Sequence, residues 1–166
     1  DGDVTAFAAP TVLNGTLFVG SARGVVQALD AKTGCVHWTF QANGPVRAAI
    51  LPVRRGSSYS LVFSDLIGWV YAIEGKSGKV LWKKRLDDHE AARLTGSAVA
   101  LNDIVFIPAA SWEETRSVDP QYECCTFRGN LVALDAATGK QIWKTYTILE
   151  EPKFTRKTKN GVNHYG

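Results

Sequence analysis

The sequence predicts an all-β fold: about three four-stranded blades of a larger β-propeller. Three segments of equal length recur, each with an acidic residue seventh, Gly eleventh and Trp last: GVVQALDAKTGCVHW (24–38), GWVYAIEGKSGKVLW (68–82) and GNLVALDAATGKQIW (129–143). Within them, apolar residues alternate or run for a few positions, which is strand spacing. The final tryptophans stand at positions 38, 82 and 143, so the first spacing is 44 residues, typical of a propeller blade.

Each repeated segment is predicted to be a β-hairpin. Its acidic residue can bond the turn backbone, and its Gly can adopt positive φ. A further strand precedes each hairpin, and another precedes that one. In chain order these strands are expected in AAPTVL (8–13), TLFVG (16–20), RAAIL (47–51), SLVFS (60–64), LTGSAVAL (94–101) and IVFIP (104–108). Asn14-Gly15, between two apolar runs, indicates a tight hairpin turn.

The tryptophan that ends each unit has a predicted structural task. A large ring at the blade edge can cover the neighbouring blade, so Trp38, Trp82 and Trp143 are interpreted as packing residues rather than as ligand-stacking ones. The larger step to Trp143 indicates an insertion at 108–128. Residues 1–166 are therefore interpreted as one partial propeller domain, whose exposed blade flanks would be completed by further blades or by another copy of the chain.

Composition limits the class of protein. The chain is 45% hydrophobic and 21% charged, which is ordinary for a globular domain. Its net charge of +3 is too small to indicate nucleic-acid binding. A basic cluster at Lys153, Arg156, Lys157 and Lys159 is either a solvated loop, a contact to missing sequence or a docking patch for an anionic partner. No apolar run is long enough for a membrane span, and the first residues do not resemble a signal peptide.

The pattern ALDAATGKQIW resembles the tryptophan-docking repeat of dehydrogenases that use pyrroloquinoline quinone (PQQ). Those enzymes are eight-bladed propellers that oxidise alcohols and aldoses in the periplasm. The third unit, with PAASWEE before YECCTFRGNLVALDAATGKQIWKTY, is similar to the subgroup that contains polyvinyl-alcohol dehydrogenases. This resemblance implies PQQ and calcium as cofactors, and cytochrome c or another acceptor of electrons. No Cys-x-x-Cys-His motif occurs, so any haem c would lie outside this chain.

The resemblance also implies site residues. A calcium-binding carboxylate follows the strand equivalent to IVFIP, which assigns it to Glu113 or Glu114, with Glu113 favoured; the alternative is a solvated acidic loop. Thr95 and Ser97 resemble hydroxyl residues that bond the quinone's carboxylates, or else belong to a turn before a strand. Arg47 is expected either to pair with the anionic cofactor or to be an ordinary surface guanidinium. The family's general base belongs to a later blade, so no catalytic residue is assigned here.

Adjacent cysteines at 124 and 125 can close a vicinal disulfide in an oxidising compartment. In the resembling alcohol dehydrogenases such a ring packs on the quinone, although there it lies one blade earlier, so contact of Cys124 and Cys125 with the cofactor stays open. Cys35 is expected to be a buried free thiol in a strand. His37, His89 and His164 share no metal or triad spacing, and His37 and His89 are interpreted as structural or solvated.

Two functions remain. The first is a segment of a periplasmic PQQ- and calcium-dependent alcohol dehydrogenase, inactive alone, that forms one side of the cofactor pocket. The second is a non-catalytic PQQ-type propeller that binds protein partners. The insertion at 111–128 favours the enzyme, because a scaffold has no need of an acidic pair and vicinal cysteines there.

Overall fold

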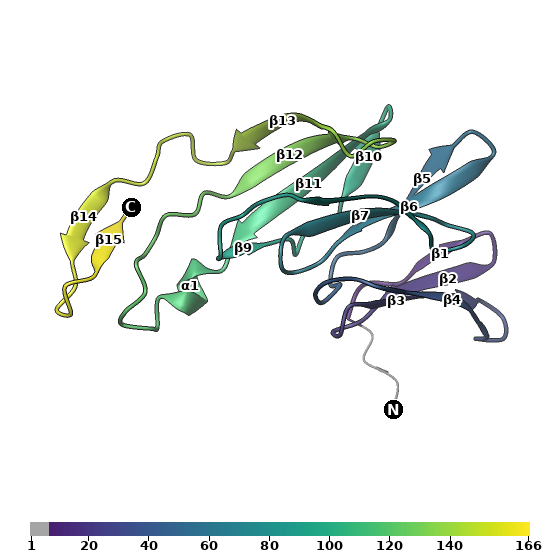
Figure 1. Ribbon diagram of the computed structural model, residues 1–166, viewed down its shortest axis with the longest axis horizontal. Helices are drawn as coiled ribbons and strands as arrows, with labels where there is room; N and C mark the ends of the chain where they lie inside the picture. The colour runs from purple at the N-terminus through teal and green to yellow at the C-terminus, as the bar shows by residue number, and fades with distance from the viewer. Residues whose placement is uncertain (1–6) are drawn as a thin grey trace.

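The computed structural model describes residues 7–166, and its strands form successive antiparallel sheets (Figure 1). The first blade has strand order β1-β2-β3-β4, with bounds Thr11–Leu13, Thr16–Gly20, Val25–Asp30 and Val36–Gln41. The second has order β5-β6-β7-β8, with bounds Leu51–Arg55, Ser58–Ser64, Trp69–Glu74 and Val80–Arg85. The third has order β10-β11-β12-β13, with bounds Val99–Leu101, Ile104–Ser111, Asn130–Asp135 and Gln141–Tyr146.

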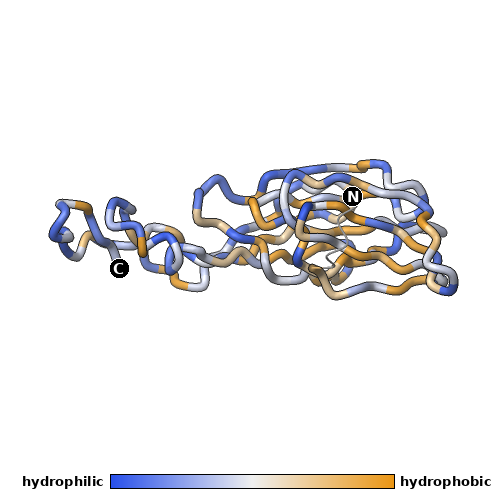
Figure 2. Tube along the Cα trace, turned by 90° about the horizontal axis from the view of Figure 1, so that it is seen from below, coloured by the Kyte–Doolittle hydropathy of each residue, from blue (hydrophilic) through white to orange (hydrophobic). Residues whose placement is uncertain are grey.

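These blades confirm the predicted three four-stranded sheets, and the described residues add smaller elements. Strand β9 (Ala92–Arg93) pairs with the end of β11, and the short helix α1 (Glu113–Arg116) follows β11. A separate hairpin joins β14 (Phe154–Lys157) to β15 (Asn163–Tyr165). This hairpin extends away from the blades in Figure 1, and its trace is mainly hydrophilic in Figure 2, whereas the blade strands are rich in hydrophobic residues.

All three turns form with their glycine at positive φ, and in the first and third blades the acidic side chain bonds the turn backbone as expected; in the second blade Glu74 instead accepts a hydrogen bond from the Ser77 hydroxyl. In the first blade Asp30 Oδ1 accepts hydrogen bonds from the backbone N–H groups of Lys32 and Thr33, and Gly34 adopts φ +72°. Asp135 and Gly139 repeat this arrangement in the third blade. Asn14 and Gly15 both have positive φ, which confirms the tight hairpin between β1 and β2.

Each blade also carries a β-bulge at the same place. In the first, Ala28 pairs with Trp38 and Leu29 with Val36, which leaves His37 without an opposite residue. The same register shift occurs between Ala72 and Ile73 and between Ala133 and Leu134. A bulge bends the strand and re-aims its side chains. Here it lies next to the tryptophan that ends each unit.

The tryptophans dock as predicted at the two junctions between blades. Trp38 Nε1 donates to the carbonyl of Gly75 at 3.2 Å, and Trp82 Nε1 donates to that of Ala136 at 2.9 Å. The Trp143 side chain is 40% exposed and tilts against Phe106 of its own blade, with ring centroids 5.8 Å apart. The packing prediction is thus confirmed for Trp38 and Trp82, and docking of Trp143 on a further blade stays a prediction.

Two apolar clusters fill the junctions. One joins the first and second blades and includes Phe18, Val26, Phe63 and Tyr71. The other joins the second and third blades and includes Val62, Val70, Val105 and Val132. The second blade is covered on both faces, so residues 60–64 of β6 are buried without alternation.

Some predicted details are wrong. Cys35 is a free cysteine, but it is exposed rather than buried. It lies in the turn before β4, directly after Gly34 at positive φ, so its side chain does not enter the core. The strand expected in RAAIL begins only at Leu51; the preceding residues Ala48 and Ile50 are buried in an irregular segment.

Candidate functional site

The insertion between β11 and β12 buries one carboxylate. Glu113 is the first residue of α1 and is only 2% exposed. Its place is fixed locally, because the Glu113 N–H donates to Ser111 Oγ at 3.0 Å and the Trp112 N–H donates to the Ala91 carbonyl at 2.9 Å. Glu114, the neighbouring candidate, is exposed on the same helix. Of the two candidates, Glu113 is therefore the buried one, and a role as metal ligand stays a prediction.

Three donors hold the Glu113 carboxylate. Oε1 accepts from the Tyr122 hydroxyl at 3.1 Å and from the Thr126 N–H at 2.8 Å, while Oε2 accepts from the Phe127 N–H at 2.9 Å. Hydrogen bonds of this kind offset the cost of burying a charged group. A carboxylate oxygen has two lone pairs, so Oε2 keeps acceptor capacity after its bond to Phe127.

Tyr122 is well suited to the donor role. Burial raises the pKa of Tyr122 to about 12, and the nearby charge of Glu113 and the hydrogen bond to it act in the same direction. The phenol therefore stays protonated at neutral pH and donates to the carboxylate. The Arg116 guanidinium lies over the Tyr122 ring at 4.9 Å and pairs with Glu90 at 3.0 Å, which restricts the ring further.

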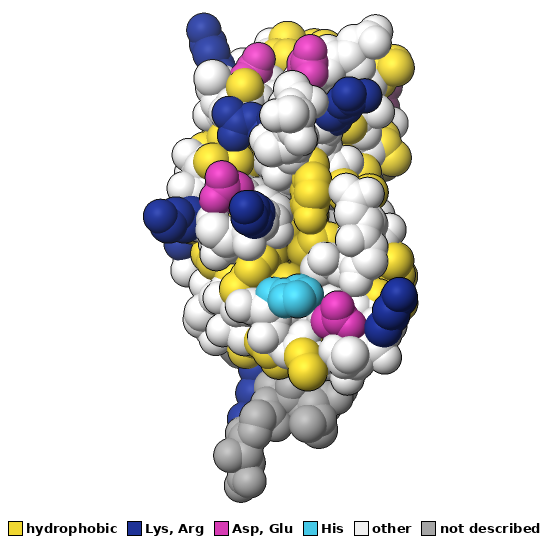
Figure 3. Space-filling model, turned by 90° about the vertical axis from the view of Figure 1, so that its right-hand side faces the viewer, with side chains coloured by type: hydrophobic (Ala, Val, Ile, Leu, Met, Phe, Trp, Pro, Cys, Tyr) yellow, Lys and Arg dark blue, Asp and Glu magenta, His cyan; other side chains and the backbone are white. Residues whose placement is uncertain are grey.

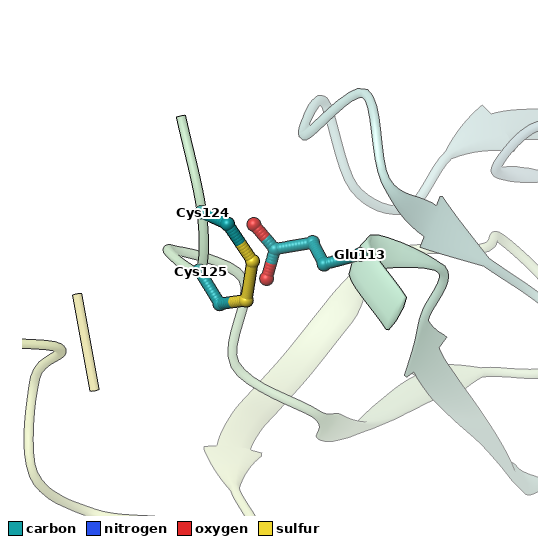
Figure 4. A group of neighbouring side chains, drawn as sticks. All are labelled: Glu113, Cys124 and Cys125. Carbon is teal, nitrogen blue, oxygen red and sulfur yellow. A yellow bond between two sulfur atoms is a disulfide. The ribbon is translucent and has the colours of Figure 1, made fainter. Parts of the chain in front are cut away.

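The predicted vicinal disulfide is present and lies beside this carboxylate. Cys124 and Cys125 are bonded to each other. Their sulfur atoms and a Glu113 carboxylate oxygen all lie within 4.8 Å of one another, and Figure 4 shows the carboxylate pointing toward the sulfurs. Strand β15 steadies the pair, because the Tyr165 N–H donates to the Cys124 carbonyl at 2.6 Å.

The other predicted cofactor residues do not contact this cluster. Ser97 Oγ accepts a hydrogen bond from the Ala49 N–H at 3.0 Å, so it links the second and third blades. Thr95 and Arg47 are exposed, and the Arg47 guanidinium lies 5.6 Å from the centre of the Phe7 ring. These three residues stay predictions that concern the wider pocket.

The donor set suits part of a site for a hard cation. Calcium takes six to eight oxygen ligands, often carboxylates. Glu113 offers one buried carboxylate with free acceptor capacity. The remaining oxygens must come from the cofactor, solvent or residues outside this cluster. The residues present therefore fit a contribution to a calcium site and do not form a complete one.

Sequence reasoning missed the groups that surround Glu113. Tyr122 donates a side-chain hydrogen bond, but Thr126 and Phe127 use main-chain N–H groups, which any residue except proline supplies. His89, interpreted as structural or solvated, is half-buried, and its Nε2 lies 2.9 Å from Thr126 Oγ1. Only the path of the insertion loop could have revealed these contacts.

A different hollow lies away from this cluster, at the junction of the first two blades. The cavity of about 560 Å³ is lined by residues that include His37, Trp38 and Glu74. In Figure 3, which views the molecule from the right-hand side of Figure 1, hydrophobic side chains form a seam between charged ones. Within residues 7–166, the cluster of His, Cys, Asp and Glu side chains close enough to share a metal is Glu113 with the disulfide-bonded Cys124 and Cys125, and it lies outside this cavity.

Successive four-stranded blades joined by docking tryptophans define part of a PQQ-type β-propeller. The chain belongs to the PQQ_2 family, whose model is described as outer membrane protein assembly factor BamB and matches residues 3–158. None of the helices in residues 7–166 has the length and apolar character needed to cross a membrane.

The relatives include alcohol dehydrogenases. The chain is 41% identical over 160 residues to polyvinylalcohol dehydrogenase of Pseudomonas sp, covering 94% of this chain and 25% of that protein. The identity is 42% over 160 residues to the polyvinylalcohol dehydrogenase of Sphingopyxis sp. (strain 113P3), covering 94% and 24%. The structure of quinohemoprotein alcohol dehydrogenase ADHIIG from Pseudomonas putida HK5 matches with a TM-score of 0.72 at 25% identity, over 97% of this chain and 23% of that one. The chain thus spans about a quarter of the length of the curated relatives it matches.

Proposed function

We propose that this chain is a segment of a periplasmic PQQ- and calcium-dependent quinoprotein dehydrogenase that oxidises alcohols, polyvinyl alcohol or other primary and secondary alcohols among them. The buried Glu113 carboxylate, held beside the Cys124–Cys125 disulfide, carries this proposal. It lies within the region that is 41% identical to a polyvinylalcohol dehydrogenase. The remaining blades, supplied by the rest of a longer protein or by another copy, would complete the propeller.

The residues of this chain have separate roles in the proposal. Glu113 would supply a carboxylate oxygen to calcium, with Tyr122 and the Thr126 and Phe127 N–H groups fixing its orientation. The disulfide would offer an apolar surface against the cofactor. Arg47, Thr95 and Ser97 would contribute to binding its carboxylates.

When bound, PQQ supplies the group that accepts a hydride from the alcohol carbon. Glu113 would help to hold the calcium ion, and the surrounding loop would exclude water from that carboxylate. The alcohol proton would pass to a base from another blade. Electrons would leave to cytochrome c or another acceptor, through a haem c if the rest of the protein carries one.

The description of the family model favours a second candidate function, a non-catalytic scaffold that binds protein partners. The arrangement around Glu113 argues for the enzyme, because a binding surface has no need of a buried carboxylate with unused acceptor capacity. The two functions predict different behaviour toward calcium and PQQ.

The test compares Glu113→Gln with Glu114→Gln in the whole protein. The amide removes a charge that calcium needs but keeps the shape of the side chain, so calcium affinity should fall by at least about 10-fold. Alcohol-dependent reduction of a dye should fall with it. The Glu114→Gln variant is the matched control and should retain both properties, since that side chain is exposed.

Wild-type calcium affinity and turnover in both variants would contradict the assignment of the metal ligand. Failure of the unmodified whole protein to bind PQQ would favour the scaffold. Calcium is measured by titration calorimetry and PQQ by its absorbance after gel filtration.

A further inference from the structure

The segment that follows β8 contacts both ends of the insertion between β11 and β12, the loop that contains Glu113. On one side, the Ala91 carbonyl accepts the Trp112 N–H at 2.9 Å, directly before Glu113. On the other side, His89 Nε2 lies 2.9 Å from Thr126 Oγ1. The His89 ring also packs edge-on against Phe127, with ring centroids 5.2 Å apart. Residues 89–91 therefore bridge the start and the end of the insertion.

His89 is itself held in one orientation. Its backbone N–H donates to Asp87 Oδ1 at 3.0 Å, and its Nδ1 accepts the Ala91 N–H at 3.1 Å. A ring nitrogen that accepts a hydrogen bond carries no proton, so the neutral ring carries its proton on Nε2. The hydrogen bond between His89 and Thr126 therefore runs from Nε2 to the threonine hydroxyl.

The two residues that His89 contacts are the same two whose N–H groups hold the carboxylate. Thr126 donates to Glu113 Oε1 and Phe127 to Oε2. His89 thus fixes one of these residues through its hydroxyl and the other through its ring. Neither contact reaches Glu113 directly, which separates His89 from the groups that would bind metal.

We propose that His89 is a positioning residue for the Glu113 carboxylate, acting through Thr126 and Phe127. This positioning should increase the affinity of the carboxylate for a hard divalent cation. The effect on cation binding rests on the proposed function, whereas the positioning of the Thr126 and Phe127 N–H groups does not. Loss of the His89 ring leaves the carboxylate in place but loosens the donors that orient it.

The experiment uses the whole protein with calcium removed and then titrated back. The test variants are His89→Ala, Thr126→Val and the double variant; His37→Ala, an exposed strand histidine in the first blade, is the matched control. Calcium affinity is measured by calorimetry. Hydrogen exchange of the Thr126 and Phe127 amides is measured in the metal-free protein, where it reports local opening without any bound cofactor.

We expect His89→Ala to weaken calcium binding by about 10-fold, at the lower end of the effects of groups behind a metal ligand. Exchange of both amides should become faster by a similar factor. Thr126→Val should have a smaller effect, and the double variant should match His89→Ala, because both changes remove the same hydrogen bond. His89→Gln, which keeps an N–H donor, should recover part of the loss, and His37→Ala should behave as wild type.

Unchanged exchange of the two amides in His89→Ala would overturn the proposal, whatever the calcium affinity. Calcium affinity within twofold of wild type would overturn it as well if the wild type binds calcium. An equal effect of His37→Ala would do so too, by showing a general loss of stability. If wild type binds no calcium while exchange still becomes faster in His89→Ala, the positioning role stands and the proposed function fails.

Discussion

The two junctions between blades share one geometry but differ in charge. At each, the docking tryptophan lies over a turn glycine of the next blade: a Cβ on Gly78 would come within 2.9 Å of the Trp38 ring, and one on Gly139 within 2.7 Å of the Trp82 ring. At each junction, the lysine that directly follows the tryptophan of the next blade contacts a side chain in the segment between the two blades. Lys83 Nζ donates to Asn43 Oδ1 at 2.8 Å in the first junction.

In the second junction, Lys144 Nζ contacts Asp87 Oδ2 at 2.9 Å. Asn43 and Asp87 occupy the same position, five residues after the tryptophan of their own unit. Burial raises the pKa of Asp87, but hydrogen bonds from Lys144 and from the His89 N–H outweigh it, and the pKa falls below its usual 3.8. The lysine at the junction thus contacts a neutral amide in the first junction and forms an ion pair in the second. Only the second junction should therefore lose stability when the pH falls.

The first prediction concerns the tryptophans and has the largest expected effect. Trp82→Ala should lower the free energy of unfolding of the whole protein by about 3 kcal/mol, because it removes a ring packed between blades and its hydrogen bond to Ala136. Trp143→Ala should cost about as much if a further blade docks on it. Urea denaturation measures both. A loss below about 1 kcal/mol for Trp143 would contradict that docking.

The second prediction concerns the glycines beneath those rings. Gly139→Ala should cost more than the roughly 1–2 kcal/mol expected for an alanine at positive φ, because its Cβ would also displace the Trp82 ring. Gly34→Ala is the matched control: its φ is +72°, but a Cβ there meets nothing within 4 Å. Thermal unfolding of both variants gives the difference. Equal losses would show that the tryptophan moves aside without cost.

The third prediction separates the junctions by pH and is the smallest effect. Asp87→Asn should cost about 1–2 kcal/mol near neutral pH, since it removes the charged acceptor of Lys144. A carboxyl with a lowered folded pKa stabilises the fold above its unfolded pKa, and this contribution is lost as the pH falls through the folded value. The difference between wild type and variant should therefore shrink below about pH 4.

Asn43→Asp tests the same idea in the opposite direction. It places a carboxylate beside Lys83, so the first junction should acquire the acid dependence that the second one has. Urea denaturation from pH 3 to 7 compares the two variants. An unchanged pH profile in both would mean that these lysine contacts contribute nothing measurable to stability.

Much of the fold could be predicted because the same strand-turn-strand pattern occurs three times in the sequence. The turn residues, the strand spacing and the docking of Trp38 and Trp82 all follow from short-range pattern, which local chemistry fixes. Exposure of Cys35 was not predicted, because a strand pattern does not show that the chain is still in its turn at that residue. Strand β9 and helix α1 lie in segments without repeat and left no pattern to interpret.

The candidate site was predictable only in part. Glu113 and the cysteine pair could be named from sequence, since their residue types stand out in the insertion. Their proximity could not, because Cys124 and Glu113 meet only through the path of the loop between them. The role of His89 depends on a contact between two loops from different blades, which no short-range pattern encodes.

Two of the three donors to Glu113 are peptide N–H groups, so their presence does not depend on the side chain, although their position depends on the contacts with His89. Substitutions at positions 126 and 127 keep both N–H groups, but only those that also keep the contacts with His89, such as Thr126→Ser and Phe127→Tyr, should leave their positions unchanged. Proline is the exception, because it lacks the N–H. A change in the length of the loop would also move both donors. In related sequences, changes at these two positions that keep the contacts with His89 would therefore be tolerated, whereas a single inserted residue or a proline would mark the loss of the carboxylate's support.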